Sequence, residues 1–177
     1  MYHSSRAGVF VLFTALRLSA QIAGGRALDV RPADAQYHRA TNRVYALLTP
    51  SSPQYPQSVA EIDADELYVV RWAPIPEAAY ALQLTDDGRY LYAVTPNAPA
   101  MVYRIDTATM AVDARYTPSF SDNTPLAATR IAALLPLLGQ PQSFVVVFTG
   151  PGRDTIGVAV FDADRRRAKV LSGRPIN

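Results

Sequence analysis

The stretch DDGRYLYAVT, residues 86–95, carries the strongest structural signal in the sequence. Its two aspartates and glycine predict a hairpin turn in which Gly88 takes a positive φ angle. The run rich in tyrosine and valine that follows predicts a β-strand. Residues 78–85 supply the partner strand on the other side of the turn. The stretch is therefore predicted to be the centre of a β-hairpin.

The same pattern occurs twice more along the chain. Residues 42–50 (NRVYALLTP) align with residues 88–96 (GRYLYAVTP), and residues 143–149 (SFVVVFT) form a weaker third copy. A second element that ends on aspartate follows each copy, at residues 59–63 (VAEID), 102–106 (VYRID) and 158–162 (VAVFD). Two motifs that recur in the same order predict a repeating structural unit.

Each unit has room for four strands. In the middle unit we expect strands at residues 78–85, 89–95 and 101–106 and a fourth that ends near Tyr116. Four strands in about 45 residues is the size of a β-propeller blade. The apolar run 144–148 predicts a strand buried on both faces, as in stacked blades. We therefore predict an all-β fold, a partial β-propeller of about three four-stranded antiparallel blades, at residues 28–74, 75–118 and 119–177.

The middle unit resembles a known repeat. Residues 86–95, followed by residues 102–109 (VYRIDTAT), are similar to the repeat of the YVTN-type bacterial β-propeller family, in which a DGR-led strand precedes an IDTATG turn. Met110 stands where that family has glycine, Asn42 replaces the turn glycine of the first unit, and a longer segment, 134–142, replaces the turn of the third. The resemblance implies a fold and no particular activity. A β-sandwich is the alternative fold, but its strands do not recur as four-strand units.

Residues 1–27 differ from the rest of the chain. A basic residue precedes an uninterrupted apolar run of ten at residues 7–16, and small residues follow. That order is typical of a secretory signal peptide, and the run is shorter than the roughly 20 apolar residues of a membrane-spanning helix. Cleavage after Ala20, Ala23 or Ala27 would fit. We expect a signal peptide or disordered leader and a secreted, periplasmic or cell-surface protein without a stable membrane span.

The composition excludes several classes of site. The chain has no cysteine, so disulfides, thiolate metal sites and cysteine nucleophiles are excluded. It has 17 basic and 15 acidic residues, and Arg6 and Arg17 lie in the leader, so the mature chain is near neutral. A neutral chain is not expected to bind nucleic acid. The two histidines are His3 and His38, and no partner motif for a metal site or a catalytic triad surrounds His38.

Three aspartates occupy one equivalent position of the repeat: Asp63, Asp106 and Asp162. They could form a ring of carboxylates around a channel. Each, however, stands where the third strand of its unit turns into the fourth, and aspartate side chains cap such turns by accepting hydrogen bonds from nearby backbone N–H groups. We expect the capping role.

The other candidate residues also have structural interpretations. The basic run 165–169 (RRRAK) is expected in a solvated hairpin turn, and residues 150–154 (GPGRD), which lack the Gly-Lys-Ser/Thr end of a phosphate loop, in the loop between strands two and three. Trp72 is expected to pack between blades, and residues 53–56 to form a loop. We expect His38 to line the central channel as a hydrogen-bonded structural histidine.

No residue is therefore assigned to catalysis, to a cofactor or to a metal. We expect a non-catalytic extracytoplasmic scaffold or binding module for a protein or small-molecule ligand that the sequence does not identify. The alternative is a lactonase-type metal-dependent propeller hydrolase, which would hold a divalent metal through Glu, Asn and Asp side chains. Propellers close with about four to eight blades. We expect two uncovered end faces, and either a truncated propeller or self-association through those faces.

Overall fold

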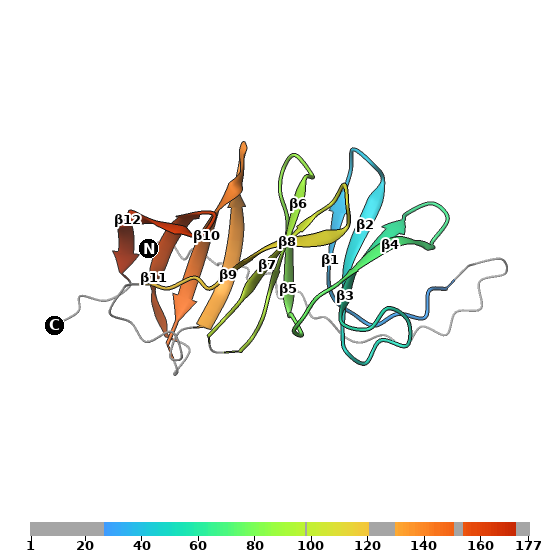
Figure 1. The fold of residues 1–177 in the computed structure, drawn as a ribbon, viewed down its shortest axis with the longest axis horizontal. Coiled ribbons are helices and arrows are strands. Elements are labelled where there is room, and N and C mark those ends of the chain that lie inside the picture. Colours follow the sequence, from blue (N-terminus) through green and yellow to red (C-terminus); the bar gives the residue numbers. More distant parts are fainter. Residues whose placement is uncertain (1–26, 98, 121–129, 151–153, 173–177) are drawn as a thin grey trace, which may run out of the picture.

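The computed structural model describes residues 27–97, 99–120, 130–150 and 154–172. It contains three four-stranded antiparallel sheets, each with its strands in chain order, and Figure 1 shows the three sheets side by side. The all-β, partial-propeller fold is thus confirmed. Apart from Ala27, the expected leader lies outside the described residues, and no helix in the described part is long and apolar enough to cross a membrane.

Each sheet is one blade of the propeller. Blade one contains β1 (Pro32–His38), β2 (Arg43–Leu48), β3 (Ser58–Asp63) and β4 (Val69–Pro74). Blade two contains β5 (Ala81–Leu84), β6 (Tyr90–Val94), β7 (Val102–Asp106) and β8 (Ala111–Tyr116). Blade three contains β9 (Arg130–Leu137), β10 (Gln140–Thr149), β11 (Thr155–Asp162) and β12 (Arg165–Ser172).

The hairpin that defines the repeat forms as the sequence predicts. Gly88 has a φ of 71°, and its N–H donates to the Thr85 carbonyl at 2.9 Å, which closes the turn between β5 and β6. Asp87 Oδ1 accepts the Arg89 N–H at 3.0 Å and so holds the start of β6. Asn42, at the equivalent position of blade one, has a φ of 52°, a conformation that asparagine tolerates better than most residues.

Two apolar seams join the three sheets. The residues of β6 alternate between them: Leu91 and Ala93 face blade one, whereas Tyr90, Tyr92 and Val94 face blade three. The seam between blades one and two includes Tyr45, Leu47, Val59, Ala73, Leu82, Tyr103 and Ile105. The seam between blades two and three includes Val102, Tyr116, Phe144, Val146, Phe148 and Phe161. Every residue of β6 is therefore buried.

The two end faces differ, which corrects the expectation that both are uncovered. On blade one, the outward residues Ala46, Leu48, Ala60 and Ile62 are buried, because Leu28, Val30 and Tyr55 of the same chain pack over them. On blade three, β10 buries Phe144, Val146 and Phe148 completely and leaves Val145 and Val147 half-buried. The prediction that residues 144–148 are buried on both faces was wrong, because no described segment packs on the second face.

The start of blade three also differs from expectation. Residues 134–137, predicted to belong to a long turn, are the end of β9, and the chain reverses at Leu138 and Gly139. Gly139 has a φ of 69°, like the turn glycine of blade two. The pairing of β10 with β9 shifts register between Gln140 and Phe144. The additional residues therefore lengthen a hairpin instead of the turn.

The outer turns of blades one and two share one geometry. Leu67 and Met110 each lie four residues after the repeat aspartate, with φ angles of 51° and 49°, and their N–H groups donate to the carbonyls of Asp63 and Asp106. For residues other than glycine, this left-handed conformation costs about 1–2 kcal/mol. The two residues differ in burial: Leu67 is 45% exposed, and Met110 is 5% exposed in the seam between blades one and two.

This difference predicts opposite effects of one substitution. Leu67→Gly should stabilise the protein by about 1 kcal/mol, because it releases backbone strain and loses little burial. Met110→Gly should destabilise it by about 1–3 kcal/mol, because the lost burial outweighs the released strain. Chemical denaturation of both variants measures the change. Effects of the same sign and size would show that seam burial does not decide the outcome.

Candidate functional site

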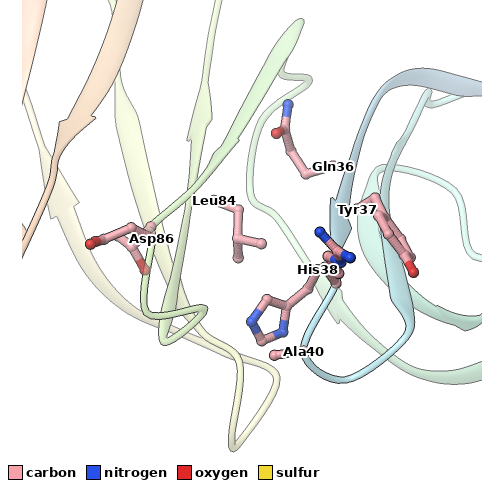
Figure 2. A pocket seen from close by; sticks show the side chains of 8 residues that line it. Gln36, Tyr37, His38, Ala40, Leu84 and Asp86 are labelled. Atoms are coloured by element: carbon pink, nitrogen blue, oxygen red, sulfur yellow. The ribbon is translucent and has the colours of Figure 1, made fainter.

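An open groove lies between the inner strands of blades one and two. Its volume is about 670 Å³, and Figure 2 shows the side chains around it. Its lining comes from the end of β1 and the following turn, and from the end of β5 and its turn: Gln36, Tyr37, His38, Arg39, Ala40, Leu84, Thr85 and Asp86. We call it the inner groove.

Two side chains of β1 fix one wall of the inner groove against the other. Asp34 Oδ2 accepts the Leu82 N–H at 2.8 Å, and Gln36 Nε2 donates to the Leu82 carbonyl at 2.9 Å. Both backbone groups of one β5 residue are thus satisfied by side chains from the neighbouring blade. Sequence reasoning missed Asp34 and Gln36; their one signal is that they stand two positions apart on a strand and so point to the same face.

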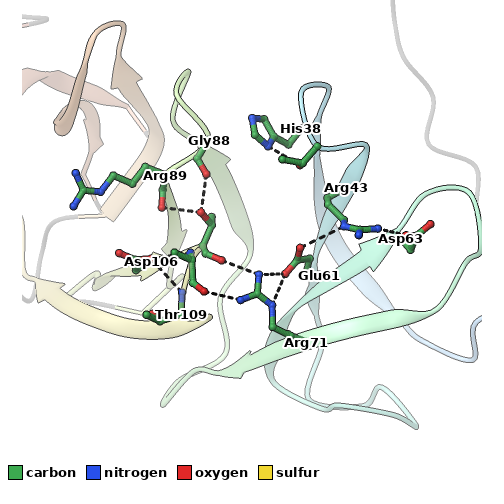
Figure 3. Close-up of polar contacts among 12 residues, drawn as sticks. His38, Arg43, Glu61, Asp63, Arg71, Gly88, Arg89, Asp106 and Thr109 are labelled. Carbon is green, nitrogen blue, oxygen red and sulfur yellow. Dashed lines mark hydrogen bonds and ion pairs between the residues drawn. The ribbon is translucent and has the colours of Figure 1, made fainter.

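His38 is a structural residue at the end of the inner groove. Its Nδ1 atom lies 2.8 Å from Thr41 Oγ1, which confirms the predicted hydrogen-bonded histidine. Its ring also lies directly against Gly88, so that a Cβ atom at Gly88 would overlap it. His38 and Gly88 come from different blades (Figure 3). Glycine is therefore required at position 88 for two reasons: the positive φ angle, and the close approach of the His38 ring, which leaves no room for a Cβ atom.

The charges of the inner groove are unequal. Asp86 Oδ2 accepts the Gly139 N–H of blade three at 2.9 Å, which turns this carboxylate away from β1 (Figure 2). Arg39 is exposed on the other wall. The Tyr37 hydroxyl donates to Asn42 Oδ1 at 2.9 Å and belongs to the turn of blade one. Arg39 is therefore the cation on the β1 side of the groove, and a guanidinium can bind a small anion but is not a nucleophile.

A second polar contact joins blades one and two near their outer strands. Arg71 of β4 donates to Glu61 and also reaches the carbonyls of Thr107, at 3.0 Å, and Ala108, at 2.6 Å (Figure 3). Arg43 pairs with Glu61 from the other side. Glu61 is 5% exposed, so two guanidinium groups neutralise an otherwise unfavourable buried charge. The contact fixes the relative position of the two blades.

Two of the three repeat aspartates cap their turns as predicted. Asp63 Oδ1 accepts the N–H groups of Asp65 and Glu66, at 3.0 and 2.9 Å. Asp106 Oδ1 accepts those of Ala108 and Thr109, at 2.8 and 3.3 Å. The hydrogen bond from Glu66, together with Arg43, lowers the pKa of Asp63 below its usual range.

For Asp162 the capping prediction was wrong. Here β11 and β12 are joined by a tight turn, with Asp162 opposite Arg165, and the carboxylate binds other side chains instead. Asp162 Oδ1 accepts hydrogen bonds from Arg167 Nη2 at 2.8 Å and from Ser143 Oγ at 2.7 Å. The hydrogen bond from Arg167 has the larger effect and that from Ser143 the smaller, and together they lower the pKa of Asp162 to about 2.

The remaining candidates lie apart from the inner groove. Residues 165–169 belong to β12 and not to a turn, and Arg166 of this run donates to the Phe120 carbonyl. The ends of the 150–154 segment lie between β10 and β11, as predicted, with residues 151–153 outside the described part. The prediction for Trp72 was wrong. Trp72 is 51% exposed, and its ring packs against that of Tyr55 at a tilt of 44°, with 4.6 Å between centroids. It faces away from the seam because its neighbour Ala73 faces the seam.

A metal centre would need several acidic or histidine ligands together. In the described ranges, 27–97, 99–120, 130–150 and 154–172, no three His, Cys, Asp or Glu side chains are grouped in a way that could hold a metal ion. The repeat aspartates are each engaged in their own turn or ion pair.

Comparisons with known proteins agree with the propeller architecture. No family model and no curated protein matches the chain. Among solved structures, hydrazine synthase of Kuenenia stuttgartiensis superposes with a TM-score of 0.59 at 14% identity, over 80% of this chain and 37% of that one. The WD40 repeats of RRP9 give 0.60 at 9%, over 85% and 41%. The β-propeller domain of Myceliophteria thermophila Swd1 gives 0.56 at 12%, over 78% and 42%.

These similarities define the class of protein. At such low identity they establish the fold alone, and the chain has the fold of a β-propeller with three blades described. It spans about two fifths of the length of these neighbours, 37% to 42%.

The contact between His38 and Gly88 predicts a measurable coupling. Gly88→Ala should destabilise the protein by about 1–3 kcal/mol, from backbone strain and overlap with the ring. Gly139→Ala is the matched control, because Gly139 has the same kind of φ, 69°, and nothing lies within 4 Å of an added Cβ. In a His38→Ala background, the excess cost of Gly88→Ala over Gly139→Ala should disappear in chemical denaturation. An excess that persists without the imidazole would refute the contact.

The Asp162–Arg167 pair predicts a pH-dependent stability. Because the folded pKa of Asp162, about 2, is depressed, its contribution is present above the unfolded value of roughly 3.9 and is lost as the pH falls through the folded value. Asp162→Asn should therefore lower the thermal unfolding midpoint at neutral pH and not near pH 2. Asp164→Asn, at an exposed turn residue, is the control. An equal loss at both pH values would contradict the ionic origin.

Proposed function

We propose that the chain is a non-catalytic β-propeller binding module that works outside the cytoplasm. The observation that carries the proposal is the inner groove, whose two walls come from separate blades and are fixed together through Leu82. Preformed walls limit the conformational entropy that the protein must lose when a ligand binds. The cellular location rests on the sequence of residues 1–27, and we also propose that the middle blade is a YVTN-type repeat, on the motifs at residues 86–95 and 102–109.

The chemistry of the inner groove favours a small carboxylate ligand. The Arg39 guanidinium can bind a carboxylate through two parallel N–H groups. Asp86, the acidic residue of the groove lining, accepts the Gly139 N–H and is not paired with Arg39. Because the groove is open to solvent, we expect weak binding. A propeller hydrolase would need a metal held by several carboxylates, and no observation on the described residues favours it.

The test uses the whole chain, isotopically labelled, and citrate as the probe. Citrate should shift the amide resonances of residues 36–40 and 84–86 and leave those of β10 and β11 unchanged. Arg39→Gln should abolish these shifts, because the cation that binds the carboxylate is removed. Arg115→Gln, at an exposed arginine of β8, should preserve them.

Two results would contradict the proposal. The first is an absence of shifts around the inner groove, or shifts that persist in Arg39→Gln. The second is calorimetric binding of Ca²⁺ or Zn²⁺ with sub-micromolar affinity, which would favour the metal-dependent hydrolase instead.

A further inference from the structure

The outward face of blade three is an apolar surface that no described segment covers. We call it the blade-three face; it consists of Ala133, Leu135, Val145, Val147, Val158, Val160 and Leu171. Leu135 is 52% and Leu171 is 75% exposed, whereas Phe144 and Phe148, on the opposite face of the same sheet, are fully buried. A contiguous apolar patch on a sheet face is a common mark of an interaction site.

The repeat shows what this face is equivalent to. Strand pairing aligns the three blades on the repeat aspartate. The residue two positions before it pairs across the strands as Glu61 with Tyr45 in blade one, Arg104 with Tyr92 in blade two, and Val160 with Val145 in blade three. In blades one and two, this pair lies in the seam with the next sheet.

The charged member of each seam pair has its own partner. Glu61 pairs with Arg71, and Arg104 with Asp113 at 2.9 Å. In blade three both members are valine, so the face offers no charge at its centre. The blade-three face therefore corresponds to the faces that form the two seams, with an apolar residue in place of the charged one.

The other end of the arc is already closed. Leu28, Val30 and Tyr55 pack over the outward face of blade one, where Leu48 is 2% and Ala60 is 0% exposed. A second copy therefore has no free blade-one face on which a blade-three face could dock. Head-to-tail addition, and closure of two copies into a ring of six blades, would both require that cover to be displaced.

We propose that two copies of this chain pack their blade-three faces against each other around a two-fold axis. In a two-fold contact the same surface patch is used on both copies, so this face needs no second, different surface to dock on. The valines of β10 and β11 are β-branched and of similar size, so that two sheets can stack face to face, as in a β-sandwich. At the corner of the face, Asp162 pairs with Arg167 at 2.8 Å and so presents no net charge to the partner.

The oligomeric state tests this proposal directly. Sedimentation of the full chain over a wide concentration range should give a reversible monomer–dimer equilibrium. The double variant Val147→Thr, Val158→Thr keeps the side-chain shape and should raise the dissociation constant at least tenfold. Val70→Thr changes a half-buried valine of β4 and should leave the equilibrium unchanged. Circular dichroism of the dilute double variant should show an unchanged sheet content.

Thiol accessibility provides a second readout, because the chain has no cysteine of its own. In the dimer, Leu135→Cys should react with a thiol reagent at least tenfold more slowly than Leu138→Cys, which changes an 83% exposed residue at the neighbouring turn. On dilution to the monomer, the two rates should converge.

Three outcomes would overturn the proposal. They are a monomer at every concentration, a dimer that the two threonines leave unchanged, and growth into assemblies larger than a dimer.

Discussion

The structure depends on one constraint, which is that an apolar sheet must cover both of its faces. The central strand β6 shows it most clearly, because all its residues are buried and alternate between two seams. Blade two alone would expose both sets, as is usual for a single unit of a repeat protein. The order of the three sheets follows from this constraint. The outward face of blade one has no neighbouring sheet in the described part of the chain, and Leu28, Val30 and Tyr55 cover it instead. On the outward face of blade three, the valines of β10 stay half-buried.

Polar contacts then fix how the stacked sheets are placed. The apolar seams are non-directional, whereas Arg71, Asp34 and Gln36 bind particular backbone groups of blade two. Between blades two and three, the Tyr92 hydroxyl donates to the Pro141 carbonyl at 2.7 Å, and burial raises the pKa of this tyrosine so that it remains a donor. The inner groove is a consequence of this placement, since its lining belongs to two sheets that no local sequence pattern connects.

The sequence predicts what is local and repeated. The turn at Gly88, the middle blade and the caps at Asp63 and Asp106 follow from motifs within one unit, and the structure confirms them. The errors concern contacts between distant segments. Trp72 faces away from the seam because the alternation along β4 directs its neighbour Ala73 into the seam. Asp162 accepts a hydrogen bond from the Arg167 side chain and does not cap the backbone N–H groups of its turn. The wall contacts of the inner groove join residues 46 or 48 positions apart. The sequence therefore indicates that Asp34 and Gln36 share one face of a strand, and not which distant segment they contact.

Amide hydrogen exchange at Leu82 tests the stacking of the blades most directly. This N–H donates to Asp34 of blade one, so its protection reports the docking of the two blades. The account predicts slow exchange in the native protein. It also predicts fast exchange in Asp34→Ala, with the amides of β6 still protected. Fast exchange of Leu82 in the native protein, with β6 protected, would contradict the docked arrangement.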